Sequence, residues 1–245
     1  MKQGQYWDVM WNPIKMRCTK ASAGCKNCWH LRFANRHAAN PNMPKRWQDA
    51  WAGKDTPFLD PRTLSMPRSW RKPRVIFTQT MGDIFHESIP LKFQQQIWCE
   101  MLDARQHLFL VLTKRPLKLL EFYEVEPDLF DYPAGQNIIT GISAENQDVM
   151  NDRWYTLCQV PGRHWASLEP LLGPVGVFYG PGMHNGYTAK MPDWVAFGPE
   201  TGHGARPAHP EWMDAIASQC GSLGIPFFDK RKANPIAHML PRRVR

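Results

Sequence analysis

Short, continuous apolar runs alternate along this chain with stretches of helical character, and this alternation limits the possible folds more than any other feature. Strands that are buried on both faces of a parallel sheet have this continuous apolar character. Helical stretches between such strands imply right-handed βαβ crossovers. The pattern therefore predicts an α/β fold with an open or closed parallel barrel. The apolar runs cover residues 6–11, 74–80, 107–113, 137–143, 164–168, 193–198 and 224–228, and the helical stretches cover 90–104, 116–123, 146–158 and 210–223.

Polar residues follow almost every predicted strand. In parallel barrels the chemistry lies at the carboxyl ends of the strands, so these residues are the candidates for a site. A polar loop is ordinary at such a place, but a Glu just beyond three of the strands is less so. The candidates are Asn12, Gln79, Asp83, His86, Lys114, Arg115, Ser143, Glu145, Asn146, Glu169, Glu200, Thr201, Asp229 and Lys230.

Two stretches interrupt the pattern of strands and helices. Residues 40–72 are rich in Pro, Trp and basic side chains, and residues 173–192 are rich in Gly and Pro. Long loops of this kind often serve as active-site lids. We predict one domain over residues 1–245, with these two stretches as loop excursions over the barrel mouth.

The composition of the 245-residue chain bears on its location and partners. No run of 18 apolar residues predicts a membrane helix, and the N-terminus lacks the features of a signal peptide, which together favour the cytoplasm and no membrane partner. The formal charge of +8 favours a polyanion such as nucleic acid. Tryptophans near the first of two basic groups suit base stacking. The basic groups are Arg62, Arg68, Arg71, Lys72 and Arg74, and Lys230, Arg231, Lys232, Arg242, Arg243 and Arg245; the tryptophans are Trp47, Trp51 and Trp70.

Three cysteines follow the first predicted strand with the spacing C-x6-C-x2-C: Cys18, Cys25 and Cys28. Three thiolates can hold a 4Fe–4S cluster and leave one iron open. A zinc site with His30 or His37 as the fourth ligand fits the spacing almost as well, and unrelated free thiols are a third interpretation. The position at the barrel mouth favours the cluster. The other cysteines, Cys99, Cys158 and Cys220, fall in predicted helices and are expected to be core residues.

The segment WNPIKMRCTKASAGCKNCW resembles the opening of a phage and bacterial family known only as a phage protein of unknown function, which looks like a divergent branch of the radical SAM superfamily. The resemblance extends over most of the chain, through FTQTMGDIFHESIP, VLTKRP, GISAEN, SLEPLLGP and GPETGHGARPAHPEW. The cysteine spacing departs from the commonest superfamily pattern, C-x3-C-x2-C. Asp229 and Lys230 also depart from the Lys-Gln-Trp expected after the last strand.

The resemblance implies a partial (βα)6 TIM-like parallel barrel with an N-terminal cluster-binding loop. It implies that a 4Fe–4S cluster on Cys18, Cys25 and Cys28 cleaves S-adenosylmethionine to a deoxyadenosyl radical, with a flavodoxin or ferredoxin as electron donor. The turn at Asp83 would hold the methionyl amino group. The complete set expected to contact S-adenosylmethionine is Asp83, Lys114, Ser143, Glu145, Glu169 and Glu200.

The expected substrate is a base of nucleic acid, for example a modified thymine in phage DNA that is rearranged by an isomerase-type reaction in the host cytoplasm. A duplex base would have to be flipped out to reach the barrel mouth. Repair of DNA photoproducts is an alternative, and a non-enzymatic nucleic-acid-binding protein stabilised by zinc or a cluster is another. No general base is identified, although His86, His203 and His209 are candidates by location.

Overall fold

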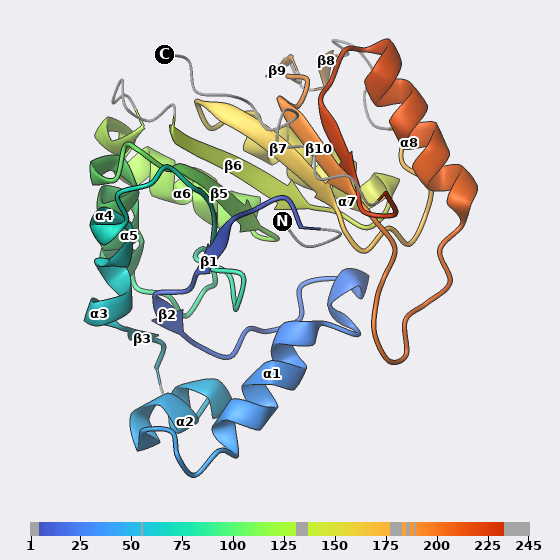
Figure 1. The fold of residues 1–245 in the computed structure, drawn as a ribbon. Helices are drawn as coiled ribbons and strands as arrows, with labels where there is room; N and C mark the ends of the chain where they lie inside the picture. Colours follow the sequence, from blue (N-terminus) through green and yellow to red (C-terminus); the bar gives the residue numbers. More distant parts are fainter. Residues whose placement is uncertain are drawn as a thin grey trace.

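The computed structural model describes residues 5–54, 56–130, 137–176 and 190–232, and the backbone of 183–184 and 187–188. Its centre is a seven-stranded sheet in the order β1-β4-β5-β6-β7-β10-β11, in which every neighbouring pair is parallel. The sheet curls into a half-barrel (Figure 1). Its strands are β1 (Val9–Trp11), β4 (Val75–Thr78), β5 (Leu108–Thr113), β6 (Ile138–Ser143), β7 (Arg163–Leu168), β10 (Trp194–Phe197) and β11 (Phe227–Asp229).

The helices that alternate with these strands lie close to the predicted stretches. Pro116 and Pro210 occupy the first turns of α6 and α8, where a missing N–H costs nothing. Asn146 caps α7 by accepting a hydrogen bond from the Val149 N–H at 3.0 Å. The helices are α5 (Leu91–Asp103), α6 (Pro116–Val125), α7 (Gln147–Leu157) and α8 (Pro210–Ser222), with the 3-10 turn η2 (Pro127–Leu129) after α6. The predicted alternation of parallel strands and helices is confirmed.

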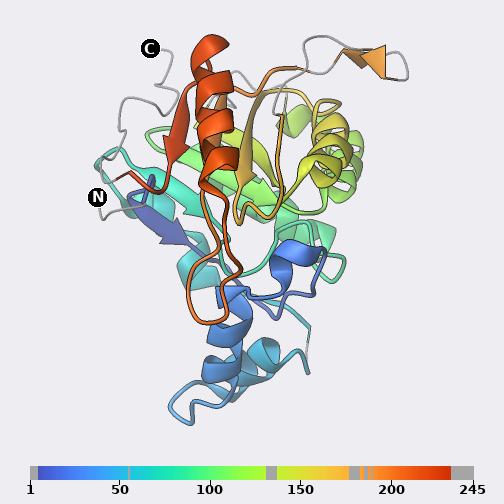
Figure 2. The same ribbon diagram turned by 90° about the vertical axis from the view of Figure 1, so that its right-hand side faces the viewer.

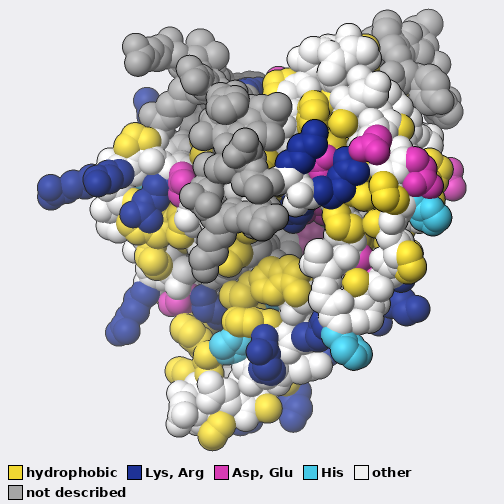
Figure 3. Space-filling model, turned by 45° about the vertical axis from the view of Figure 1, so that its right-hand side comes forward, with side chains coloured by type: hydrophobic (Ala, Val, Ile, Leu, Met, Phe, Trp, Pro, Cys, Tyr) yellow, Lys and Arg dark blue, Asp and Glu magenta, His cyan; other side chains and the backbone are white. Residues whose placement is uncertain are grey.

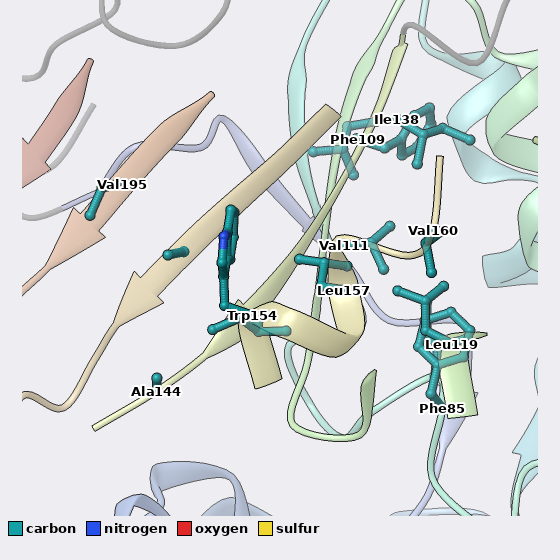
Figure 4. Close-up of a cluster of buried hydrophobic side chains, with 14 of the residues drawn as sticks. Phe85, Phe109, Val111, Leu119, Ile138, Ala144, Trp154, Leu157, Val160 and Val195 are labelled. Atoms are coloured by element: carbon teal, nitrogen blue, oxygen red, sulfur yellow. The ribbon is translucent and has the colours of Figure 1, made fainter. Parts of the chain in front are cut away.

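Both faces of the sheet are buried, which explains why its strands have no polar alternation. Successive side chains of a strand point to opposite faces. On the convex side they pack with the helices in one large apolar cluster, which includes Phe109, Val111 and Ile138 (Figure 4). On the concave side a second cluster is rich in aromatic rings: Tyr6, Phe77, Leu108, Leu110, Ile139, Trp165, Trp194, Ala196 and Phe228.

The segment between β1 and β4 contains several helices. Helix α1 (Trp29–Ala38) and helix α2 (Lys45–Ala52) form a hairpin that projects beyond the carboxyl edge of the sheet in both ribbon views (Figures 1 and 2). The 3-10 turn η1 (Ala23–Cys25) precedes it. A small antiparallel pair, β2 (Ile14–Lys15) with β3 (Phe58–Leu59), joins the hairpin to the body. Two short helices follow, α3 (Pro61–Leu64) and α4 (Met66–Ser69).

Residues 40–72, predicted to be a loop excursion over the mouth, therefore contain three helices. The helices form because prolines stand at their starts and because Trp51, only 2% exposed, packs against α1. In the second predicted excursion, 173–192, residues 177–182, 185–186 and 189 lie outside the described residues. Within the described part, the backbone forms the short antiparallel pair β8 (Met183–His184) and β9 (Tyr187–Thr188). Among the described helices, none is both long and apolar enough to span a bilayer.

Gly141 in β6 is required by the aromatic packing on the concave face. A Cβ atom at this position would lie 2.4 Å from the Trp165 ring and 2.6 Å from the Trp165 carbonyl oxygen. The ring is fully buried and donates its N–H to the Val111 carbonyl oxygen at 3.1 Å, so it has no free space to move into. The absence of a side chain at residue 141 thus lets Trp165 fill the barrel interior.

We predict that Gly141→Ala lowers the free energy of unfolding by about 1–3 kcal/mol, because overpacking forces the Trp165 ring and the backbone to shift. Urea unfolding followed by tryptophan fluorescence measures the change. Gly221→Ala in α8 is the matched control: nothing lies within 4 Å of its Cβ position, so better helix propensity is expected to add about 0.5–1 kcal/mol. Equal stability of the two variants would contradict this role of Gly141.

Candidate active site

A cavity of about 540 Å³ lies at the carboxyl edge of the half-barrel. Its volume is in the range of small-molecule and cofactor sites. All three cysteines of the sequence motif line it. So do five of the six residues expected to contact S-adenosylmethionine: Asp83, Lys114, Ser143, Glu169 and Glu200. In a parallel sheet, the residues that follow each strand all lie at the same edge, so the topology explains why these residues converge.

Two carboxylates from distant strands hold the cysteine segment, residues 18–28, against this edge. Glu145, just after β6, accepts a hydrogen bond from the Gly24 N–H at 2.9 Å. Glu200, after β10, accepts one from the Asn27 side chain at 2.9 Å. Cys25 lies between these two anchors, and Cys28 directly precedes α1.

Glu145 is the one predicted contact residue that does not line the cavity, because it lies behind the cysteine segment. It is 1% exposed, and Arg153 is its ion-pair partner at 3.7 Å. Burial raises the pKa of Glu145, but the Gly24 N–H and the neighbouring Lys114 and Arg153 charges reverse the effect, so the net pKa is lowered. A Cβ atom on Gly24 would lie 3.2 Å from a Glu145 oxygen, so the close approach depends on glycine.

Glu200 is a second anchored carboxylate. Arg206 donates to it from its backbone N–H and Nε, both at 2.9 Å, and from Nη2 at 2.5 Å. The hydrogen bonds from Arg206 lower the pKa of Glu200 to about 2. Sequence reasoning missed both Asn27 and Arg206, because nothing in their spacing shows that Glu200 would bring them together.

Asp83 lines the cavity, but its carboxylate is occupied by groups of the protein. It accepts from the Thr113 hydroxyl at 2.9 and 3.0 Å and from the Lys114 N–H at 3.0 Å. Arg115 Nη1 adds an ion pair at 3.3 Å. Asp83 therefore links the turn after β4 to the turn after β5 and fixes the backbone that carries Lys114 and Arg115.

Two cations stand beside the cysteines. The Lys114 ammonium donates a hydrogen bond to the Ser143 hydroxyl at 2.6 Å. It also lies close to the cysteine segment, because a Cβ atom added to Gly24 would be 3.5 Å from Lys114 Nζ. Arg115 Nη1 lies 4.0 Å from Cys18 Sγ. Burial lowers the pKa of Lys114, and the nearby Cys25 acts in the opposite direction. These charges would stabilise thiolates on the cysteine segment.

One part of the cavity lining is aromatic. Tyr6, Trp7 and Phe77 line it, and the Tyr6 and Trp7 rings meet edge to face with centroids 4.7 Å apart. Glu169 and Lys230 form an ion pair there. The Lys230 ammonium also lies 5.7 Å from the Tyr6 ring centroid. The second Glu169 oxygen, Oε1, is buried without a hydrogen-bond partner.

The cavity lining also bears on the choice of metal. Among the described residues, no three His, Cys, Asp or Glu side chains converge closely enough to ligate a single metal ion. His30 lines the cavity with both ring nitrogens unbonded, and burial lowers its pKa to about 4. His37 instead packs on Phe33, with ring centroids 3.8 Å apart. Both the zinc and the cluster interpretations of the cysteine motif therefore stay predictions.

The two predicted basic groups are partly neutralised inside the protein. Arg68 pairs with Glu100 at 2.7 Å, and Arg231 pairs with Asp214 at 2.8 Å and with Asp229 at 2.6 Å. Arg74 lies over the Trp70 ring at 4.9 Å. Arg242, Arg243 and Arg245 lie outside the described residues. Of the general-base candidates, His86 contacts Thr19 and Ser88, and His209 contacts Glu211.

We predict that the Cys18 thiol of the metal-free protein is slow to alkylate. Burial, helped by Asp83, raises the pKa of Cys18 from 9.0 to about 12, which outweighs the effect of Arg115. The thiolate is the nucleophile, so the alkylation rate should still rise about tenfold per pH unit between pH 9.5 and 11. Mass spectrometry of iodoacetamide-treated protein measures this at Cys18. A rate that levels off near pH 9.5 would contradict the prediction.

Comparison with known proteins places the whole of this chain in one family. The chain matches no curated protein and no solved structure. A family model described as "Protein of unknown function (DUF5131)" matches residues 2–242, which include the cysteine segment and every strand of the sheet. The chain therefore belongs to this family, DUF5131.

Proposed function

We propose that this protein is a radical S-adenosylmethionine enzyme that holds a 4Fe–4S cluster on Cys18, Cys25 and Cys28. One observation carries the proposal: the three thiols line a single cavity at the carboxyl edge of a parallel half-barrel. The cavity contains polar groups from the ends of β4, β5, β6, β7 and β10 beside them. The finer description as a partial (βα)6 TIM-like barrel with a cluster-binding loop is part of this proposal.

The donor set of the cavity suits an iron–sulfur cluster. Iron–sulfur clusters are held by Cys thiolates, and a cluster on three thiolates would leave one iron free to bind S-adenosylmethionine. When bound and reduced by a flavodoxin or ferredoxin, the cluster would supply the electron that breaks a C–S bond, yielding methionine and a deoxyadenosyl radical. Lys114 and Arg115 would offset the negative charge of the thiolates.

The residues around the cluster divide into positioning and contact groups. Glu145 and Glu200 hold the cysteine segment, and Asp83 holds the turn that carries Lys114. Lys114 and Ser143 face the cavity together and are suited to bind the carboxylate or ribose of S-adenosylmethionine. Glu169, with one unbonded oxygen, can accept a further hydrogen bond from a ligand.

A nucleic-acid base is the substrate class that the cavity supports best. Its lining includes the partly exposed Trp7 ring, on which a planar base could stack, and the Glu169–Lys230 pair supplies one acceptor and one donor. A modified thymine of phage DNA is the proposed example, rearranged in an isomerase-type reaction. To reach this cavity, the nucleotide would have to be unpaired or flipped out.

The test is anaerobic reconstitution with iron and sulfide, reduction, and measurement of deoxyadenosine released from S-adenosylmethionine. We expect the native protein and the control Cys99→Ala to bind about four irons per chain and to release deoxyadenosine. Cys99, expected from the sequence to be a core residue, is instead an exposed thiol outside the cavity. We expect Cys25→Ala to lose both the cluster and the release, because one of three ligands is missing.

Two results would separate the alternatives. One tightly bound zinc, no cluster and no release would contradict the enzyme proposal and support a metal-stabilised nucleic-acid-binding protein. Turnover of ultraviolet-damaged DNA, with no change in modified thymine nucleosides, would replace base rearrangement with photoproduct repair.

A further inference from the structure

The positive charge of this protein is concentrated in one short part of the chain. Residues 15–55 contain nine of the 30 lysines and arginines but only two of the 22 acidic residues, Asp49 and Asp55. This segment therefore carries +7 of the formal charge of +8, whereas the rest of the chain has 21 basic and 20 acidic residues. Apart from β2 and the cysteine segment, most of it forms the α1–α2 hairpin.

Most of these charges face solvent and are not neutralised within the described part of the chain. There, only Lys15 and Lys45 have acidic partners, Asp60 at 3.8 Å and Asp49 at 2.7 Å. The exposed basic residues are Lys20, Lys26, Arg32, Arg36, Lys45, Arg46 and Lys54. Several Lys and Arg side chains are visible on the lobe at the bottom of Figure 3. We call this set the hairpin surface.

The hairpin surface is fixed beside the cavity mouth. Trp29, His30 and Leu31 of α1 line the cavity. Arg32 donates to the His203 carbonyl oxygen at 3.3 Å and to the Asn27 carbonyl oxygen at 3.0 Å, which ties α1 to the loop after β10. A strand that lies along the hairpin would therefore pass the opening of the cavity.

Trp29 adds a stacking group at the point where the hairpin surface meets the cavity. Its side chain is 49% exposed although it lines the cavity, so one part of the ring is open to solvent. An exposed aromatic ring beside a cationic surface is the combination that binds single-stranded nucleic acid. Any of the four bases can stack on such a ring, so this contact does not depend on the nucleotide sequence.

We propose that the hairpin surface binds the phosphodiester backbone of a DNA strand and that Trp29 stacks on a base next to the one that enters the cavity. The proposal rests on the proposed function for the identity of the polyanion, but it concerns binding alone. The two basic groups expected from the sequence are partly engaged in internal pairs. The hairpin surface is instead largely open and continuous with the cavity.

The test measures binding of a fluorescent 20-nucleotide single-stranded DNA by anisotropy over a series of salt concentrations. It uses the full chain, both as purified and after reconstitution with iron and sulfide. Arg36→Gln/Lys54→Gln removes two exposed charges that contact no cysteine. We expect weaker binding and a decrease of about 1.4 in the slope of log K against log salt, because each neutralised phosphate contributes about 0.7 for single strands.

Lys92→Gln/Lys118→Gln is the matched control, since it removes two charges from α5 and α6 and should leave the slope unchanged. Trp29→Leu should weaken binding about fivefold or more without changing the slope, because stacking releases no counterions. Circular dichroism establishes that the variants are folded.

Three results would overturn the proposal. The first is an equal slope for Arg36→Gln/Lys54→Gln and its control, and the second is salt-independent binding by the native protein. The third is tighter binding of RNA of the same sequence than of DNA. DNA binding can be measured whether or not the protein releases deoxyadenosine, and deoxyadenosine release is assayed without DNA. The two proposals can therefore fail separately.

Discussion

Two buried carboxylates hold the cysteine segment against the rim of the sheet, and the candidate site depends on these contacts. Glu145 accepts a hydrogen bond from the Gly24 N–H, and Glu200 accepts one from the Asn27 side-chain amide. A carboxylate this well buried is stable only with charged or N–H partners, which Arg153 and Arg206 supply. The same contacts place Cys25 and Cys28 over the cavity rather than in solvent.

A buried carboxylate also links the turn after β4 to the turn after β5. Asp83 accepts from Thr113 and Lys114 and pairs with Arg115, so a single buried anion fixes the two cations that stand near the thiols. Polar groups at a strand end can therefore be structural while they shape the charge of a site. Asp83, expected to contact S-adenosylmethionine directly, is better suited to positioning Lys114 and Arg115.

The apolar sheet and the basic segment occupy different parts of the molecule. The half-barrel is packed on both faces with apolar side chains. Residues 15–55, which include the cysteine segment and the α1–α2 hairpin, carry +7 of the formal charge of +8. The cavity lies where the two parts meet. Such a separation would suit the two proposals, because the basic segment would attract a polyanion over a distance and the cavity would hold the reacting groups away from it.

Much of the fold could be predicted from the sequence, because its signals are local. Continuous apolar runs between helical stretches indicate strands buried on both faces, and each of the seven runs overlaps a strand of the sheet. Prolines and an asparagine at the helix starts set their boundaries to within a few residues. The position of the cysteines after the first strand also indicated that they would reach the carboxyl edge, where the cavity lies.

The contacts between distant segments were decided only by the tertiary structure. Glu145 and Gly24 are 121 residues apart, and Asn27 and Glu200 are 173 apart. The sequence by itself determined the strands, most of the helices, the cysteine motif and the excess of positive charge. Only the folded chain decided which carboxylates hold the cysteines and which cations remain unpaired, because pairing depends on distances in space that no local pattern encodes.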